Sequence, residues 1–130
     1  MASIFTKIIN REIPAHIVAE NEHCLAFLDI SPLVTGHTLV IPKKEVDYIF
    51  DLDTSTLTNL HLFARDVAVA MKKGLPCPRV GVAVIGLEVP HAHIHLVPLR
   101  QMSDMNFANP KLRPTPDELA ATALKIRSAF

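Results

Sequence analysis

The sequence predicts an antiparallel α+β domain, and three observations lead to this prediction. Short apolar segments follow one another at hairpin spacing, which is typical of antiparallel strands. One longer segment repeats its apolar residues with the period of an α-helix. The chain has 130 residues, 49% of them hydrophobic, which is enough to bury a core. We therefore expect a single domain over residues 1–130, with a sheet of about five strands, one long central helix and short helices near both ends.

Capping and turn residues define the first elements. Ser3 can cap a short helix that ends at about Asn10. Gly36 precedes the third predicted strand, and Pro42 stops it because proline lacks the amide hydrogen that a sheet needs. The predicted strands of this half of the chain cover residues 17–20, 24–28 and 38–41.

The long helix is predicted over residues 56–73. Asp53, Thr54 or Ser55 can cap its start. Gly74 fits the left-handed residue that often ends a helix. Its apolar residues recur at steps of three and four and form one stripe, which consists of Leu57, Leu60, Ala64, Val67 and Met71.

Two further strands and a helix are predicted in the C-terminal half. The strands cover residues 79–85 and 89–98. Thr115, Pro116 and Glu118 have the pattern of an N-cap, a first-turn proline and a capping-box glutamate. The apolar side of this last helix is predicted to consist of Leu119, Ala123, Leu124 and Ile126.

The most informative stretch is the second of these strands, which carries His91, His93 and His95. Side chains alternate between the two faces of a strand, so all three imidazoles are expected on one face. Neither a core nor solubility requires such a row. It can bind a metal, hold a phosphate, or supply a nucleophile at neutral pH.

Composition excludes several classes of function. Lys and Arg number 13, as do Asp and Glu, so no basic excess favours nucleic acid or a membrane surface. No stretch approaches the roughly 20 apolar residues that span a bilayer. The N-terminal residues lack a charged leader followed by a long apolar run. Cys24 and Cys77 have no metal-type spacing and are expected to be reduced thiols, so we expect a cytoplasmic protein.

The histidine triad (HIT) family has the hallmark His-x-His-x-His-x-x with apolar x, and residues 89–98 resemble it. Further blocks resemble the Hint branch of this family, in the same order along the chain: Ile4-Phe5-Thr6-Lys7-Ile8-Ile9, Glu12-Ile13-Pro14, Leu25-Ala26-Phe27-Leu28-Asp29-Ile30-Ser31-Pro32, Gly36-His37-Thr38-Leu39-Val40-Ile41-Pro42-Lys43-Lys44 and Arg100-Gln101-Met102. The resemblance therefore implies a HIT-type sheet over the predicted domain.

The resemblance also implies a two-step nucleotide hydrolase or transferase. In the family, the middle histidine attacks the α-phosphorus and forms a covalent nucleotidyl-histidine, and water then releases the nucleoside monophosphate. That histidine is His93 here, and a covalent intermediate divides one difficult displacement into two steps. His95 is expected to donate to a phosphate oxygen, while His91 and His37 are the supporting histidines.

The expected substrate is a purine nucleotide. Asp29 matches the acid that the family uses on the ribose hydroxyls, and a carboxylate can accept from two neighbouring hydroxyls. The expected substrate-binding residues are Asp29, Ile30, Gly86, Leu87, Glu88, His93 and His95, with Phe5, Ile8 and Phe27 around the base. We expect no cofactor and no metal ion, since no Asp-rich cluster accompanies the histidines.

The chain departs from the family pattern just before the triad. Leu87 stands where glutamine is common and Glu88 where Hint proteins often have serine, and no asparagine precedes Gly86 at the expected distance. Glu88 can instead supply a proton to a leaving amine or alkoxide. Two alternatives stay open, namely a zinc-binding protein that uses the three-histidine face and a catalytically weak nucleotide sensor.

A homodimer is the expected assembly. The resemblance implies that two protomers join into one continuous sheet, with their long helices packed across the two-fold axis. The helix also has a wide apolar surface, because its stripe is extended by Leu62, Phe63, Ala68, Val69 and Ala70.

Overall fold

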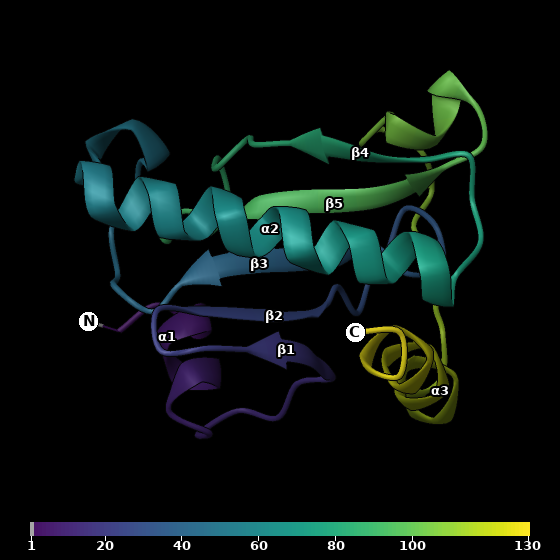
Figure 1. Ribbon diagram of the computed structural model, residues 1–130, viewed down its shortest axis with the longest axis horizontal. Coiled ribbons are helices and arrows are strands. Elements are labelled where there is room, and N and C mark those ends of the chain that lie inside the picture. The colour runs from purple at the N-terminus through teal and green to yellow at the C-terminus, as the bar shows by residue number, and fades with distance from the viewer. Residues whose placement is uncertain (1) are drawn as a thin grey trace.

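The computed structural model describes residues 2–130. Its elements in chain order are α1 (Ile4–Ile9), β1 (Ile17–Glu20), β2 (Cys24–Leu28), β3 (Thr38–Pro42), η1 (Ile49–Asp51), α2 (Thr54–Gly74), β4 (Arg79–Ala83), β5 (Ile94–Leu99), η2 (Met102–Met105) and α3 (Pro116–Arg127). The strands form one antiparallel sheet in the order β1-β2-β3-β5-β4. Helix α2 crosses one face of the sheet (Figure 1). The predicted α+β class and five-stranded sheet are confirmed.

The helices begin where the capping residues predict. Ser3, Asp53 and Thr115 each accept a hydrogen bond from the amide three residues further on, as N-cap residues do. Glu118 bonds back to the Thr115 amide and completes the predicted capping box. These local signals need no tertiary contacts, which is why the sequence identifies them.

Two predictions about helix residues are wrong. Gly74 is the last residue of α2, and Leu75 follows it as the C-cap. Glycine is required at position 74 for another reason, because a Cβ there would collide with the carbonyl oxygen of Lys125 in α3. Leu124 is 55% exposed, since it points away from the side of α3 that buries Ile126.

The two faces of the sheet bury separate cores. The core beneath α2 and α3 includes the strand residues Ala26, Val40, Ile94 and Leu96. The smaller core beneath α1 consists of Phe5, Ile8, Leu25, Phe27, Leu39 and Ile41. His95 lies between Ile94 and Leu96 on β5, so its ring faces the opposite side of the sheet, which α1 covers.

The strand that carries the histidines is shorter than predicted. β5 begins at Ile94, and β4 already ends at Ala83. The amide of Ala92 donates to the carbonyl of Val46, 2.7 Å away, and therefore lies outside the sheet. The prediction that all three histidines share one strand face is wrong, because only His95 belongs to the strand.

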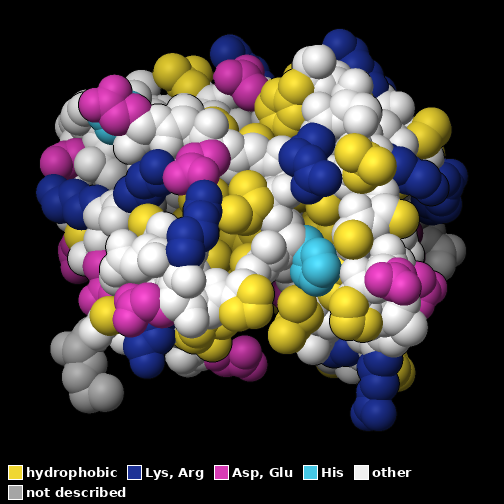
Figure 2. All heavy atoms as spheres, turned by 90° about the horizontal axis from the view of Figure 1, so that it is seen from below, with side chains coloured by type: hydrophobic (Ala, Val, Ile, Leu, Met, Phe, Trp, Pro, Cys, Tyr) yellow, Lys and Arg dark blue, Asp and Glu magenta, His cyan; other side chains and the backbone are white. Residues whose placement is uncertain are grey.

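The surface agrees with the even balance of charges. On the face that Figure 2 shows, acidic and basic side chains are interspersed among apolar ones, and neither sign forms an extended patch. This face therefore offers no broad field of one sign to a polyanion. Within residues 2–130, no helix combines the length and the apolar character that crossing a membrane requires.

Candidate active site

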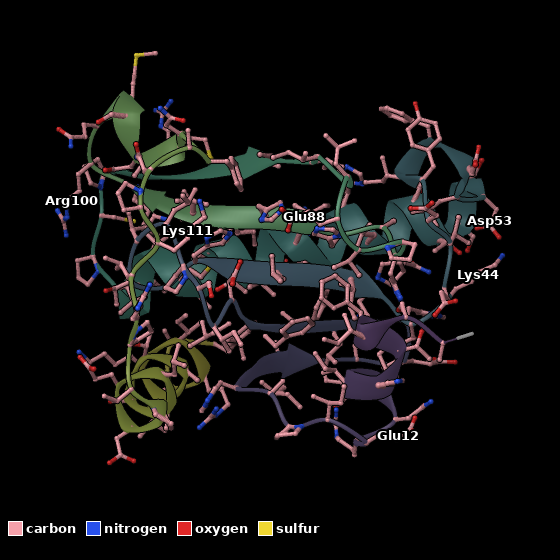
Figure 3. All side chains as sticks on the ribbon, turned by 180° about the vertical axis from the view of Figure 1, so that it is seen from behind. Glu12, Lys44, Asp53, Glu88, Arg100 and Lys111 are labelled. Carbon is pink, nitrogen blue, oxygen red and sulfur yellow. The ribbon has the colours of Figure 1, made fainter. Side chains whose placement is uncertain are left out.

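A cleft of about 480 Å³ opens on the α1 side of the sheet. Its walls come from α1, the ends of the central strands, the loop over residues 84–90 and the segment after η2. Figure 3 shows this face, with Glu88 and Lys111 over the sheet. The predicted site residues that line the cleft are Phe5, Asp29, His37, Gly86, Leu87, Glu88, His93 and His95.

Four other predicted site residues lie outside this lining. Ile8 and Phe27 are buried in the core beneath α1, where the Phe27 ring packs edge-on against Phe5. Ile30 is 67% exposed and is not among the residues that line the cleft. His91 is completely buried behind the cleft. Their side chains can support the walls of the site but do not form its surface.

His93 has a single possible proton arrangement as a neutral ring. Its Nδ1 lies 2.7 Å from the carbonyl oxygen of His91. A carbonyl oxygen only accepts, so we assign the proton to Nδ1. The lone pair of the ring is then on Nε2. An imidazole with a free lone pair on the side of the cleft is a nucleophile.

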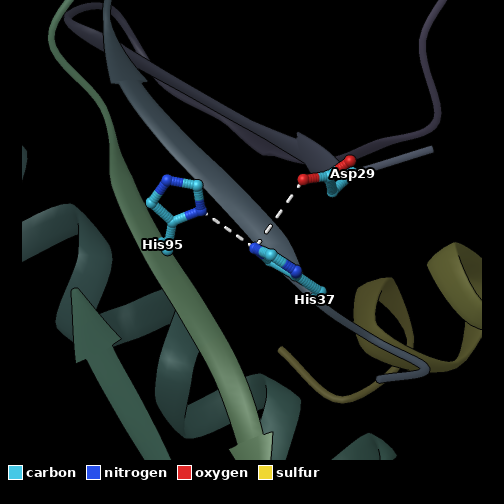
Figure 4. Close-up of side chains that lie close together, drawn as sticks. All are labelled: Asp29, His37 and His95. Carbon is cyan, nitrogen blue, oxygen red and sulfur yellow. Dashed lines mark hydrogen bonds and ion pairs between the residues drawn. The ribbon is translucent and has the colours of Figure 1, made fainter. Parts of the chain in front are cut away.

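His37 and His95 form a second ordered pair of rings (Figure 4). The Leu33 amide donates to His37 Nδ1 at 3.0 Å, so His37 carries its proton on Nε2. That nitrogen lies 2.9 Å from His95 Nδ1. His95 Nδ1 therefore accepts, and its proton is on Nε2. The amide of Leu33 thus determines, through two rings, that His95 presents a hydrogen-bond donor.

Burial keeps this pair of histidines neutral. The pKa of His95 is lowered to about 3, first by burial and then by the neighbouring His93 and His37 rings. Burial also lowers the pKa of His37, although the carboxylate of Asp29 acts in the opposite direction. Both rings therefore act as hydrogen-bonding groups and not as fixed positive charges at neutral pH.

The free nitrogens of His93 and His95 both reach the cleft. Among residues 2–130, no buried side-chain nitrogen or oxygen lacks a hydrogen-bond partner. The Nε2 atoms of these two residues have no such partner within that range, so they are open to solvent where both side chains line the cleft. The ring centroids are 4.9 Å apart. The lone pair of His93 Nε2 and the N–H of His95 Nε2 therefore lie close enough to contact the same ligand group.

Asp29 lies beside the His37–His95 pair (Figure 4). Its Oδ2 is 3.7 Å from His37 Nε2, and its Oδ1 accepts from the Ser31 amide at 2.8 Å. One possible ligand atom from each of the three residues lies within 4.8 Å of the others. A metal would need the Nε2 lone pair of His37, yet the Leu33 amide already occupies the lone pair of that neutral ring at Nδ1. The hydrogen bonds present therefore do not fit a metal here.

His91 is a structural histidine in this fold. Its Nε2 donates to the carbonyl of Pro42 at 2.9 Å, and its Nδ1 accepts from the Ser3 hydroxyl at 2.8 Å. Both nitrogens are therefore occupied by protein atoms. Since His91 does not share a face with His93 and His95, the three-histidine zinc face considered from the sequence is not formed.

The cleft is also lined by residues that were not among the predicted site residues, namely Ile4, Ser31, Leu39, Ile85, Val89, Phe107 and Lys111. Phe107 and Lys111 contact or face the histidines from a segment outside the helices and strands. The Phe107 ring packs edge-on against His95, with centroids 4.9 Å apart. Lys111 lines the cleft, and its Nζ donates to the carbonyls of Phe107 and Asn109 at 2.5 and 3.1 Å. Both lie in the irregular segment between η2 and α3, where no periodic pattern guides an interpretation. The one available signal was a lone aromatic residue and a lysine in a loop after the triad.

The loop before the triad carries the residues that depart from the family pattern. Gly86 adopts a φ of 74°, which glycine tolerates without strain. Leu87 is 88% exposed, and Glu88 is exposed at the wall of the cleft. The loop therefore places an apolar and an acidic side chain where a ligand would meet solvent.

Comparison with known proteins agrees with this geometry. Residues 10–102 match the HIT domain. An uncharacterised HIT-like protein of Methanocaldococcus jannaschii is 42% identical over 73% of this chain and 77% of its own length. An adenosine 5'-monophosphoramidase of Saccharomyces cerevisiae is 39% identical over 76% of this chain and 63% of its own length. The crystal structure of a Zn-bound histidine triad family protein from Mycobacterium smegmatis superposes with a TM-score of 0.84 at 30% identity, covering 99% of this chain and 93% of that one. The chain belongs to the HIT family.

Proposed function

We propose that this protein is a nucleotide hydrolase or transferase that uses His93 as its nucleophile. It cleaves phosphoramidate, phosphoester or anhydride bonds of nucleoside monophosphate derivatives. The observation that carries the proposal is the pair of free Nε2 atoms in the cleft, a lone pair on His93 and an N–H on His95. A phosphoryl group placed between them meets an attacking atom and a donor for its oxygen at the same time.

The proposed reaction has two steps. His93 Nε2 forms a bond to the α-phosphorus, and the bond from phosphorus to the leaving nitrogen or oxygen breaks. Glu88 is the carboxyl group at the cleft wall that can carry a proton to that leaving group. Water then attacks the phosphorus of the nucleotidyl-histidine and gives a proton back to Glu88. The bond between phosphorus and His93 Nε2 breaks, which releases the nucleoside monophosphate and leaves His93 neutral again. His95 donates to a non-bridging oxygen in both steps.

Charge and shape support a nucleotide as the substrate. Asp29 offers a carboxylate for ribose hydroxyls, and Phe5 offers an apolar wall for a base. Because the His37 and His95 rings are neutral, they do not balance the negative charge of a phosphate. Lys111 provides a positive charge at the cleft. We propose a purine nucleotide with a small leaving group, in keeping with the activity named for the yeast relative.

One experiment tests this proposal. Adenosine phosphoramidate, an AMP-lysine conjugate and a diadenosine polyphosphate are offered in parallel to the wild type and to His93→Ala. We expect turnover of at least the phosphoramidate and trapping of labelled nucleotide on the wild-type protein only. Nucleotide binding without turnover or trapping would instead identify a catalytically weak nucleotide sensor. Equal trapping by both proteins would remove His93 as the nucleophile.

Zinc binding is the second candidate, and the Zn-bound Mycobacterium smegmatis protein favours it. In this chain the group to consider is Asp29, His37 and His95. Its hydrogen bonds would have to break before zinc could bind, so we expect activity without a metal. Elemental analysis of untagged protein, together with activity before and after chelation, tests this. Activity that is lost in chelator and restored by one equivalent of zinc would support the second candidate.

We also propose a homodimer in the cytoplasm. β4 is an edge strand whose Val82 is 63% exposed, and edge strands leave backbone groups free for pairing. Leu62 and Val69 on α2 are 48% and 51% exposed. A second copy that extends the sheet and packs α2 against its counterpart would cover these side chains. Light scattering at micromolar concentration tests the dimer, and a monomeric mass would remove it; cell fractionation tests the location.

A further inference from the structure

A hydrogen-bonded cluster lies behind the nucleophile, outside the cleft, and consists of Ser3, Thr6, Glu45 and His91. Glu45 Oε1 accepts from the Ser3 amide and from the Thr6 hydroxyl, each at 2.6 Å. Ser3 Oγ accepts from the Thr6 amide at 3.0 Å and lies 2.8 Å from His91 Nδ1. The cluster thereby joins the start of α1, the loop after β3 and the loop before β5.

The shortest contacts assign the protons in this cluster. Burial lowers the pKa of His91 and favours its neutral ring. The Pro42 carbonyl accepts from His91 Nε2, so His91 Nδ1 carries a lone pair. The Thr6 hydroxyl donates its proton to Glu45. The Ser3 hydroxyl is therefore the donor to His91 Nδ1 at 2.8 Å, which is a shorter contact than its 3.3 Å distance to the Thr6 hydroxyl oxygen. The Glu45 carboxylate thus orders the Ser3 backbone and the Thr6 hydroxyl. The Pro42 carbonyl determines which tautomer His91 adopts, and the Ser3 hydroxyl donates to the lone pair that this tautomer leaves on Nδ1.

Glu45 remains a carboxylate throughout the useful pH range. The Ser3 amide and then the Thr6 hydroxyl lower its pKa to about 2. The next residue, Val46, accepts the hydrogen bond of the Ala92 amide at 2.7 Å. Residues 45 and 46 therefore hold both the start of α1 and the backbone between the first two histidines of the triad.

We infer that Ser3, Thr6 and Glu45 are positioning residues for His93, acting through His91. The His91 carbonyl accepts the Nδ1 proton of His93 at 2.7 Å, and that bond leaves the His93 lone pair on Nε2. Both nitrogens of the His91 ring are hydrogen-bonded, to Ser3 and to Pro42, and these two bonds anchor the residue and therefore its backbone carbonyl. When the anchor is lost, the carbonyl shifts, and the tautomer of His93 with its proton on Nε2 becomes accessible. That tautomer has no lone pair to attack with.

The inference rests on the proposed function, because it takes His93 as the attacking group. Its first test does not depend on activity. Two-bond ¹⁵N–¹H correlation spectra distinguish neutral histidines that are protonated on Nδ1 from those protonated on Nε2. They are recorded for the wild type, Ser3→Ala, Ser3→Thr and Thr115→Ala. Thr115→Ala is the matched control, since it removes the N-cap hydroxyl of α3, which lies away from His91.

We expect the wild type, Ser3→Thr and Thr115→Ala to show His93 protonated on Nδ1. We expect Ser3→Ala to show a mixture of the two tautomers. Its kcat should fall by about tenfold or more while KM changes by less than about twofold, because orientation is lost but binding is kept. Ser3→Ala with a single Nδ1–H form and kcat close to that of the wild type would overturn the inference.

Glu45→Gln keeps the test valid if Ser3→Ala does not fold. The glutamine side chain keeps the shape of Glu45 but loses its charge, so we expect a smaller decrease in kcat and the same direction of change in the His93 tautomer. An unchanged tautomer in this variant would also overturn the inference. If the wild type neither turns over nor traps nucleotide, the proposed function fails, whereas the tautomer comparison still decides whether the cluster positions His93.

Discussion

His93 lies between two chains of hydrogen bonds, one through His91 and one through His37 and His95, and the two chains differ in how they end. On one side, His91 has both ring nitrogens occupied by Pro42 and Ser3, and its ring is completely buried. On the other side, the Leu33 amide donates to His37, and His37 in turn donates to His95. The Nε2 of His95 remains free in the cleft. The first chain is closed by protein atoms, and the second is open to a ligand.

The difference separates positioning from chemistry. A closed chain can hold an atom in place, but it cannot respond to charge that develops on a substrate. An open chain ends in a donor that is already oriented, so no reorganisation is needed when a phosphate oxygen gains charge. Substitutions in the two chains and in His93 should therefore affect different kinetic constants, in a defined order.

The largest effect is expected for His93→Ala, which removes the attacking atom itself. The rate should fall by about four orders of magnitude or more, as for other covalent nucleophiles. The fold and the nucleotide affinity should be nearly unchanged, because the ring contributes little to ground-state binding. Single-turnover kinetics and calorimetric titration with a nucleoside monophosphate measure both. More activity in this variant than in His95→Ala would invert the assigned roles.

His95→Ala is expected to have the second-largest effect. It removes the free end of the open chain, and loss of one donor to developing charge costs about a hundredfold in kcat. The nucleotidyl-histidine should still form, only more slowly, which rapid quench with labelled substrate can detect. Complete loss of the intermediate would show that His95 does more than donate one hydrogen bond.

Asp29→Ala is expected to act mainly on binding. Contacts to ribose hydroxyls change little between the ground and transition states, so KM should rise by about tenfold with kcat within a few-fold of the wild-type value. Steady-state kinetics with a ribonucleotide and its 2',3'-dideoxy analogue measure this change. Asn at the same position is the control that keeps the size of the side chain. A large loss of kcat instead would place Asp29 in the chemistry, through its contact with His37.

The smallest effect is expected on stability against pH. Burial holds the pKa of His95 at about 3, below the usual value of 6.5, so the unfolded chain binds a proton at mildly acidic pH that the folded protein does not bind. The free energy of unfolding should therefore decrease as the pH falls below the unfolded pKa, by about 1 kcal/mol from this group between pH 6 and 5. Urea unfolding of the wild type and of His95→Asn measures the two slopes. Equal slopes would mean that His95 titrates alike in both states.

Local signals in the sequence predicted most of the framework. The caps at Ser3, Asp53 and Thr115 and the apolar stripe of α2 placed the helices within a few residues. The short apolar segments predicted the strands, since hairpins join neighbouring strands through local turns. Position 74 shows the limit of such signals, because the glycine there is required by a contact with α3 and not by the end of its own helix.

The candidate site was predicted less completely. The resemblance to the HIT family indicated residues that line the cleft, among them Asp29, His37, His93 and His95. It did not identify Phe107 or Lys111, because they lie in an irregular segment that reaches the cleft only in the folded chain. The alternation of the triad also suggested one strand face for all three histidines, which the bond from Ala92 to Val46 prevents.

By itself, the sequence determined the chemistry that is available: three histidines in five residues, an acid at position 29 and caps that begin the helices. These properties depend on residue type and short spacing, which the chain carries before it folds. Only the tertiary structure decided which nitrogen of each ring holds its proton. That choice depends on backbone groups that the fold brings to each ring, such as the Leu33 amide for His37 and the Pro42 carbonyl for His91, because a neutral imidazole takes the tautomer that its fixed donors and acceptors require.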